Sequence, residues 1–240
     1  MLSVVGRLKG SAQRDLSLAA RVRHRLAAAA HLSGHLPLAE ARFVAFDTET
    51  TGFYPHRGDA VIALGAVVCH GGEIQPEQSF HQLVNPGRPV PRAVQELTGI
   101  TDEVLRAEGV TFLEAFDRFL DFAGDAILVG HGADFDLAFL DHELRRTCRG
   151  HLRHLVLDTR RLYHFLYPEL ADYSLDALLD LHGIPPAGRH TALGDAVLAA
   201  ELFRRALPAL SERNCRTVRA VRRYAVHQSH LTMSSLGCLV

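Results

Sequence analysis

Tryptophan is absent from this chain of 240 residues, lysine occurs once, and there are only four cysteines. Because no two cysteines lie within four residues of each other, the sequence contains neither a zinc knuckle nor a CxxC redox motif. Isolated cysteines of this kind are usually reduced thiols in the cytoplasm. We therefore expect a cytoplasmic protein without structural disulfides.

Long apolar segments are also missing. No stretch approaches the roughly 20 apolar residues that a membrane helix needs, although 48% of all residues are hydrophobic, enough for the core of one domain. The N-terminus has no apolar signal core followed by a cleavage site. Its first 40 residues are rich in Arg and poor in acids, which faintly resembles a mitochondrial presequence. We prefer to interpret them as a basic helix on a cytoplasmic protein without a membrane partner.

Acidic residues are scarce at both ends of the chain. Residues 1–40 carry a net charge of +4 and residues 204–240 a net charge of +6, whereas residues 41–203 carry −11. Basic ends attract phosphate backbones, and an acidic middle repels nucleic acid unless cations bind part of its charge. Two solvated helical ends are the plain alternative, because net charge alone does not exclude it.

The hydrophobic pattern divides the chain into three parts. These are a basic helical N-terminal extension (1–40), a globular domain (41–206) and a basic C-terminal tail (207–240). In the extension, apolar residues recur at helical spacing over residues 12–31. This helix could pack on the domain, bind duplex nucleic acid or dimerise, and the sequence leaves these three alternatives open. We expect residues 231–240 to be frayed.

In the globular part, three predicted strands come first, and two more then alternate with helices. The strands are expected at 43–46, 60–69, 74–84, 126–129 and 155–157. The helices are expected at 90–97, 101–107, 111–123, 134–146, 160–166, 174–182 and 191–206. The first three strands have connections too short for helices, which indicates an antiparallel meander. The order predicts an α/β fold in which helices flank a mixed five-stranded sheet. Gly194 inside the last helix indicates close backbone packing.

Two carboxylates, Asp47 and Glu49, follow the first apolar strand. Residues two apart on a strand point to the same face. Like charges so placed repel each other, and a fold tolerates them best when a cation lies between them. A D-x-E pair is by itself a weak signal, since most such pairs are surface charges.

Two further segments place acids at the beginnings of helices. Asp136 follows the apolar strand at 126–129, and its simplest role is to favour a helix N-terminus. Asp195 lies in the first turns of the last helix, five residues after His190. A histidine at a helix entrance is suited to accepting a proton near neutral pH. Four carboxylates at strand ends and helix starts can converge at one sheet edge, and oxygen ligands of this kind suit Mg²⁺ or Mn²⁺.

The three segments together resemble the motifs of the DEDDh exonuclease family, which includes the epsilon subunit of bacterial DNA polymerase III and ribonuclease T. The segments are Phe46-Asp-Thr-Glu-Thr-Thr-Gly52, His131-Gly-Ala-Asp-Phe-Asp136 and Arg189-His-Thr-Ala-Leu-Gly-Asp195. The resemblance covers about residues 41–206 and has the family's motif order. It implies a ribonuclease H-like fold and a 3′–5′ exonuclease that releases nucleoside 5′-monophosphates.

The resemblance also implies roles for individual residues. Two Mg²⁺ or Mn²⁺ ions would be held by Asp47, Glu49, Asp136 and Asp195, with His190 as the general base. Substrate contacts are expected from Thr48, Thr51, Gly52, Ile100 and His131. The partner would be nucleic acid, DNA rather than RNA, with a polymerase or repair protein as a further candidate partner. The oligomeric state is left open.

Two departures from the family pattern favour alternatives. Gly132 stands where the family commonly has Asn, which raises the hypothesis of a weak or inactive module that docks on nucleic acid or on a polymerase. The extension before the first motif and the short basic tail differ from the epsilon subunit, which argues against a replicative proofreader. RNA 3′ ends remain the alternative substrate.

Overall fold

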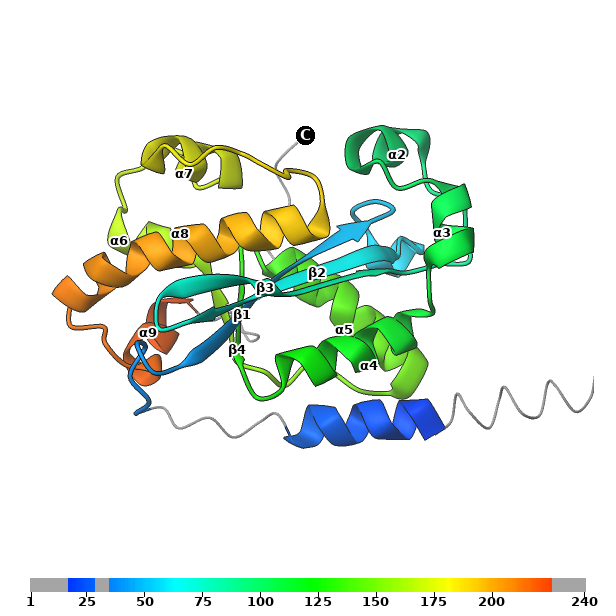
Figure 1. Ribbon diagram of the computed structural model, residues 1–240, viewed down its shortest axis with the longest axis horizontal. Coiled ribbons are helices and arrows are strands. Elements are labelled where there is room, and N and C mark those ends of the chain that lie inside the picture. The colour runs from blue at the N-terminus through cyan, green and yellow to red at the C-terminus, as the bar shows by residue number, and fades with distance from the viewer. Residues whose placement is uncertain (1–16, 29–34, 226–240) are drawn as a thin grey trace, which may run out of the picture.

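The computed structural model describes residues 17–28 and 35–225 of the chain (Figure 1). The predicted frayed segment 231–240, like residues 1–16 and 29–34, lies outside the described residues. None of the helices within the described ranges combines the length and the hydrophobicity that a membrane crossing requires.

A five-stranded sheet in the order β3-β2-β1-β4-β5 forms the centre of the structure (Figure 1). Its strands are β1 (Arg42–Thr50), β2 (Val61–His70), β3 (Glu73–Leu83), β4 (Ile127–Gly130) and β5 (Val156–Asp158). The first three pair antiparallel, whereas β4 runs parallel to β1 and β5 parallel to β4. The predicted α/β fold with a mixed sheet is therefore confirmed.

Helices cover both faces of this sheet. They are η1 (Pro55–Arg57), α2 (Arg92–Thr98), α3 (Asp102–Glu108), α4 (Phe112–Ala123), α5 (Asp134–Cys148), α6 (Thr159–Leu166), α7 (Leu175–His182), α8 (Ala192–Glu212) and α9 (Val218–Ala225). Alternate residues of β1 point to opposite faces. Val44 and Phe46 join a core with α4 and α5, while Phe43 and Ala45 join a second core with α6, α7, α8 and α9.

The N-terminal segment 17–28 is helical and packs on the domain beside α4 (Figure 1). Val22 and Leu26 are fully buried in the core that contains α4. Arg21 pairs with Asp117 of α4 at 2.9 Å, and Arg25 of the same segment contacts Asp117 as well. Of the three alternatives left open for this helix, the structure shows packing on the domain.

The chain beyond residue 206 also folds against the domain. Helix α8 continues to Glu212 with Pro208 inside it, because Ala206 and Leu210 are buried and anchor its last turns. Helix α9 follows and buries Val218 in the core beneath α6. The predicted end of α8 at residue 206 was therefore too early.

Two glycines let the start of α8 pack closely, one against the sheet and one against the loop before the helix. A Cβ atom on Gly65 of β2 would collide with backbone atoms of Ala192 and Leu193, and one on Gly194 would collide with the Gly188 carbonyl. Gly65 also lies opposite Asp47 in the β1–β2 ladder. The first turn of α8 is thus held directly over the strand position beside Asp47, and the close packing predicted for Gly194 is confirmed.

We expect Gly65→Ala to lower the free energy of unfolding by about 1–3 kcal/mol, as overpacking does, and, by displacing Asp195, to lower the nuclease activity that the motifs imply. Alanine in a strand interior is otherwise no worse than glycine, so a loss would report the contact with α8. Because this contact is with backbone, adding Ala192→Gly should not restore stability. A Gly65→Ala protein as stable and active as the parent would contradict this interpretation. Thermal unfolding and a nuclease assay test it.

Candidate metal centre and active site

The geometry of β1 distributes the functional groups between the two faces of the sheet. Asp47 and Glu49 continue the series of Phe43 and Ala45 and therefore face α8. Thr48 lies between them and faces α5 on the opposite side, where it contacts Asp136. The end of β1 thus gathers side chains from both layers of helices.

Three carboxylates come together on the α8 side. Asp47, Glu49 and Asp195 each place one carboxylate oxygen so that all three oxygens lie within 4.8 Å of one another. Asp195 is buried in the first turn of α8, whose N-terminus is capped by Thr191. Three like charges at this separation repel, and a divalent cation that accepts hard oxygen ligands would relieve the repulsion.

Asp136 lies beside this cluster without belonging to it. It is buried at the start of α5, where the Thr48 backbone N–H and hydroxyl donate to the same carboxylate oxygen at 2.9 Å and 2.6 Å. Of the four predicted ligands, three therefore lie together. The fourth, Asp136, is hydrogen-bonded to Thr48 on the other face of β1.

The local backbone supports this position of α5. Gly132 has a left-handed φ of 66°, and its N–H donates to Asp158 at 2.9 Å. A Cβ atom added at Gly132 would meet nothing within 4 Å. Asparagine, the residue usual here in the family, also tolerates this backbone conformation. Glycine thus preserves the helix start and removes only a side chain.

Proximity and burial change the acidity of the carboxyl groups. Burial and the charges of Asp136, Asp195 and Glu49 raise the pKa of Asp47 well above its usual value. Burial and the charge of Asp195 raise the pKa of Glu49 to about 7. Burial also raises the pKa of Asp136 to about 7, although the hydrogen bonds from Thr48 oppose this shift. Without a cation, the site therefore favours protonated carboxyl groups.

These raised pKa values predict how stability depends on pH. Between about pH 4.5 and pH 7, the folded metal-free chain holds protons at Glu49 and Asp136 that the unfolded chain has lost. The contribution of these groups to the free energy of unfolding must therefore fall as pH rises through this window. Divalent ions need the deprotonated carboxylates, so their stabilising effect should grow as pH rises. Thermal unfolding from about pH 5 to about pH 8, with chelator and with Mg²⁺, measures both trends; identical curves would contradict the prediction.

Arg189 neutralises part of the negative charge. Its Nη1 donates to both oxygens of Asp195 at 2.8 Å and 2.7 Å, and its Nε and Nη2 donate to Asp176 of α7 at 2.7 Å and 3.0 Å. The arginine thus links α7 to the first turn of α8. The sequence pattern predicts no role for Arg189 or Asp176, although Arg189 stands in the third motif.

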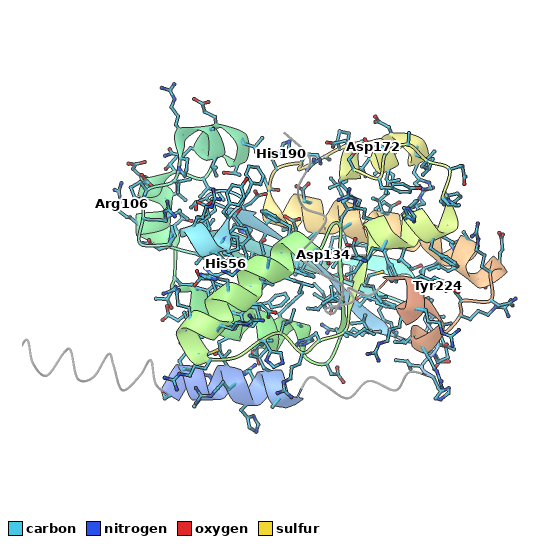
Figure 2. The ribbon with its side chains drawn as sticks, turned by 180° about the vertical axis from the view of Figure 1, so that it is seen from behind. His56, Arg106, Asp134, Asp172, His190 and Tyr224 are labelled. Atoms are coloured by element: carbon cyan, nitrogen blue, oxygen red, sulfur yellow. The ribbon has the colours of Figure 1, made fainter. Side chains whose placement is uncertain are left out.

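His190 lies just before the start of α8 (Figure 2). Its φ of 62° is in the left-handed region, and its backbone N–H donates to Asp195 at 3.3 Å. Such conformations persist where the surroundings enforce them, often at functional sites. The predicted base is therefore tied through its own backbone to one of the clustered carboxylates, and its side chain is partly exposed.

The residues predicted to contact substrate have different surroundings. Thr51 is buried, and its hydroxyl accepts from the Ala60 N–H and donates to Asp59. A Cβ on the neighbouring Gly52 would collide with the same Asp59 side chain. Both residues therefore shape the loop after β1.

Ile100 lies between α2 and α3, and His131 lies between β4 and α5. Ile100 packs with Ala192 at the start of α8. The His131 Nδ1 lies 2.9 Å from the Thr159 hydroxyl, and burial lowers the pKa of His131 to about 4. His131 is thus a neutral ring near neutral pH.

The sequence of this chain is similar to those of known exonucleases and DNA polymerase III subunits. The exonuclease family model RNase T matches residues 44–203. The chain is 43% identical over 187 residues to a DNA polymerase III subunit epsilon-like protein of Rhodobacter capsulatus, covering 77% of this chain but 26% of that protein. It is 37% identical over 166 residues to the DNA polymerase III subunit epsilon of Aquifex aeolicus, covering 69% of this chain and 80% of that subunit.

Two solved structures share the fold. The nuclease domain of 3′hExo, a DEDDh family member bound to rAMP, has a TM-score of 0.64 at 21% identity, covering 75% of this chain and 96% of that domain. Exonuclease X in complex with 5′ overhanging duplex DNA has a TM-score of 0.56 at 22% identity, covering 75% of this chain and 97% of that chain. The ribonuclease H-like fold expected from the motifs is confirmed.

Proposed function

Because the chain belongs to the RNase T family of exonucleases and is of the DEDDh type, we propose that it removes nucleotides stepwise from the 3′ end of a nucleic acid strand. The observation that carries the proposal is the convergence of Asp47, Glu49 and Asp195 within 4.8 Å, with Asp136 beside them. A hydrolysed phosphodiester bond would leave a nucleoside 5′-monophosphate and a strand with a new 3′ hydroxyl.

The donor set fits divalent metal ions with hard ligands. The clustered side chains are all carboxylates, which suits Mg²⁺ or Mn²⁺. Asp47, Glu49 and Asp195 would hold one ion, and Asp47 with Asp136 would help to hold a second. Two such ions, when bound, stabilise the attacking and leaving oxygens of a phosphodiester displacement.

The remaining residues position the reacting groups. His190, at the entrance of α8, would accept the proton of the attacking water. Its backbone bond to Asp195 keeps it beside the carboxylate cluster. Thr48 would orient Asp136 through its two hydrogen bonds. Gly52 and Ile100 would line the space for the terminal nucleotide, with His131 in the loop before α5.

We infer DNA as the substrate and a polymerase as a candidate partner from the relatives. The Aquifex aeolicus relative is a DNA polymerase III subunit, and Exonuclease X was solved with duplex DNA. RNA is the alternative substrate, because a 3′-exonuclease that recognises a histone mRNA stem-loop has a similar structure, with a TM-score of 0.62.

Purified protein incubated with 5′-labelled single-stranded DNA and with RNA of the same sequence, in Mg²⁺ and in Mn²⁺, tests the proposal. We expect stepwise shortening of DNA, faster than that of RNA, with nucleoside 5′-monophosphates as the products on chromatography. Binding of both strands without shortening in either metal would favour a docking module instead.

A further inference from the structure

A cavity of about 640 Å³ opens beside the active site, between the start of α5, helix α6 and helix α9. We call it the α9 cavity; its lining includes Gly132, Arg160, His164, Tyr173, Arg223 and Tyr224. In Figure 2, Asp134, which also lines it, lies between His190 and Tyr224. The cavity therefore extends from the second motif toward the C-terminal helix.

The charges of the lining leave two arginines available to an anion. Arg161 is paired with Asp134 at 2.6 Å and lies 3.8 Å from Asp158. Arg160 and Arg223 are exposed, and within residues 17–28 and 35–225 neither forms a salt bridge. Guanidinium groups recognise phosphate through paired N–H donors, so this arrangement suits a phosphodiester.

Aromatic rings stand among these charges. Tyr224 is 41% exposed and stacks on Phe165 at a centroid distance of 3.7 Å. Tyr173 packs against His164 at 5.1 Å. Cationic grooves with aromatic rings are the usual means of binding single-stranded nucleic acid without sequence preference.

The cavity adjoins the loop before α5, the helix that carries Asp136. Gly132 and Asp134 line it, and Asp136 lies one half-turn further along α5. Asp158, at the end of β5, accepts the backbone N–H groups of both Gly132 and Arg160. A strand whose 3′ end lies at the carboxylates would reach the cavity by crossing this loop.

From this geometry we infer that the α9 cavity binds the phosphate and base of a nucleotide upstream of the 3′-terminal one. The inference rests on the proposed function for the position of the 3′ end. Arg223 and Tyr224 lie beyond residues 44–203, which match the family model. The cavity therefore adds to this chain a contact with a longer single strand that the catalytic site alone lacks.

The experiment compares short and long substrates in Arg160→Gln/Arg223→Gln and in the matched control Arg222→Gln, whose exposed arginine lies on α9 outside the lining. With single-stranded DNA of two and of twelve nucleotides in Mg²⁺, the double variant should lose about tenfold in kcat/KM on the long substrate and little on the short one. Tyr224→Ala should show the same length dependence. Equal losses on both lengths, or none, would overturn the inference.

Binding gives a readout that does not depend on catalysis. Fluorescence anisotropy of the labelled twelve-nucleotide strand in EDTA should show weaker binding by the double variant than by Arg222→Gln. Each lost phosphate contact should also reduce the salt dependence, the slope of log K against log salt, by about 0.7. If the parent protein shortens no substrate, the proposed function fails, and this binding difference still decides the cavity. Identical binding and slopes would contradict it.

Discussion

Replacing Asp47 with Asn should lower the rate of 3′-end hydrolysis by a factor on the order of 10³ or more. Mutation of an outer partner of a metal ligand costs about 10–100-fold, and Asp47 lies at the centre of the carboxylate cluster. A neutral amide also weakens the binding of divalent ions, which require charged oxygen ligands. Rates on labelled DNA and calorimetric titration with Mn²⁺ measure the two effects.

The same substitution should not unfold the protein. Because burial and three neighbouring carboxylates raise the pKa of Asp47, its charged form is unfavourable in the metal-free fold. Asp47→Asn should therefore increase the free energy of unfolding near pH 8 in chelator, by about 1 kcal/mol or more. Asp180→Asn, an exposed position on α7, is the matched control and should change neither activity nor stability. A destabilised Asp47→Asn protein would argue that Asp47 has a structural role instead.

Replacing His190 with Gly should lower kcat by about 10²–10⁴-fold, the range expected for loss of a general base. Glycine is the informative choice because the backbone at His190 has a φ of 62°, which glycine adopts without strain. The substitution also leaves space for a small base. Added imidazole should then restore part of the activity of His190→Gly in a concentration-dependent way.

The control for His190 is His70→Gln, an exposed position at the end of β2, which should retain full activity with or without imidazole. Calorimetry should show that His190→Gly still binds Mn²⁺ as the parent does, because the carboxylates are intact. Unchanged kcat in His190→Gly, or a loss that follows weaker metal binding, would remove His190 from the role of base.

Much of the fold was predictable because four of the five strands, β1, β2, β4 and β5, contain buried apolar runs. Helix α5 was predicted at 134–146 and observed over Asp134–Cys148. The end of α8 was not predicted correctly, because Pro208 is a strong local signal against a helix. Burial of Ala206 and Leu210 overrides it. Similarly, apolar spacing predicted the N-terminal helix, but the position of its arginines against α4 depends on tertiary contacts.

The candidate site was predictable only where chemistry and motif coincide. Asp47 and Glu49 could be placed together from the two-residue period of a strand, and Asp195 from its motif. The role of Gly65 depends on which helix crosses β2 at that position, which a single strand does not reveal. Arg189 links Asp176 of α7 to Asp195 of α8. Because the two acids belong to different helices, no local sequence pattern predicts this link. The same holds for the α9 cavity, whose walls come from separate segments.

The central claim, a metal-dependent exonuclease acting from 3′ ends, is tested most directly by the polarity of degradation. We would incubate the protein and Mg²⁺ with 5′-labelled single-stranded DNA, beside the same strand blocked at its 3′ end. Our account predicts a ladder of products shortened one nucleotide at a time on the free strand, no ladder on the blocked strand, and none on either strand in EDTA. Degradation of the blocked strand, or shortening that persists in EDTA, would contradict the account.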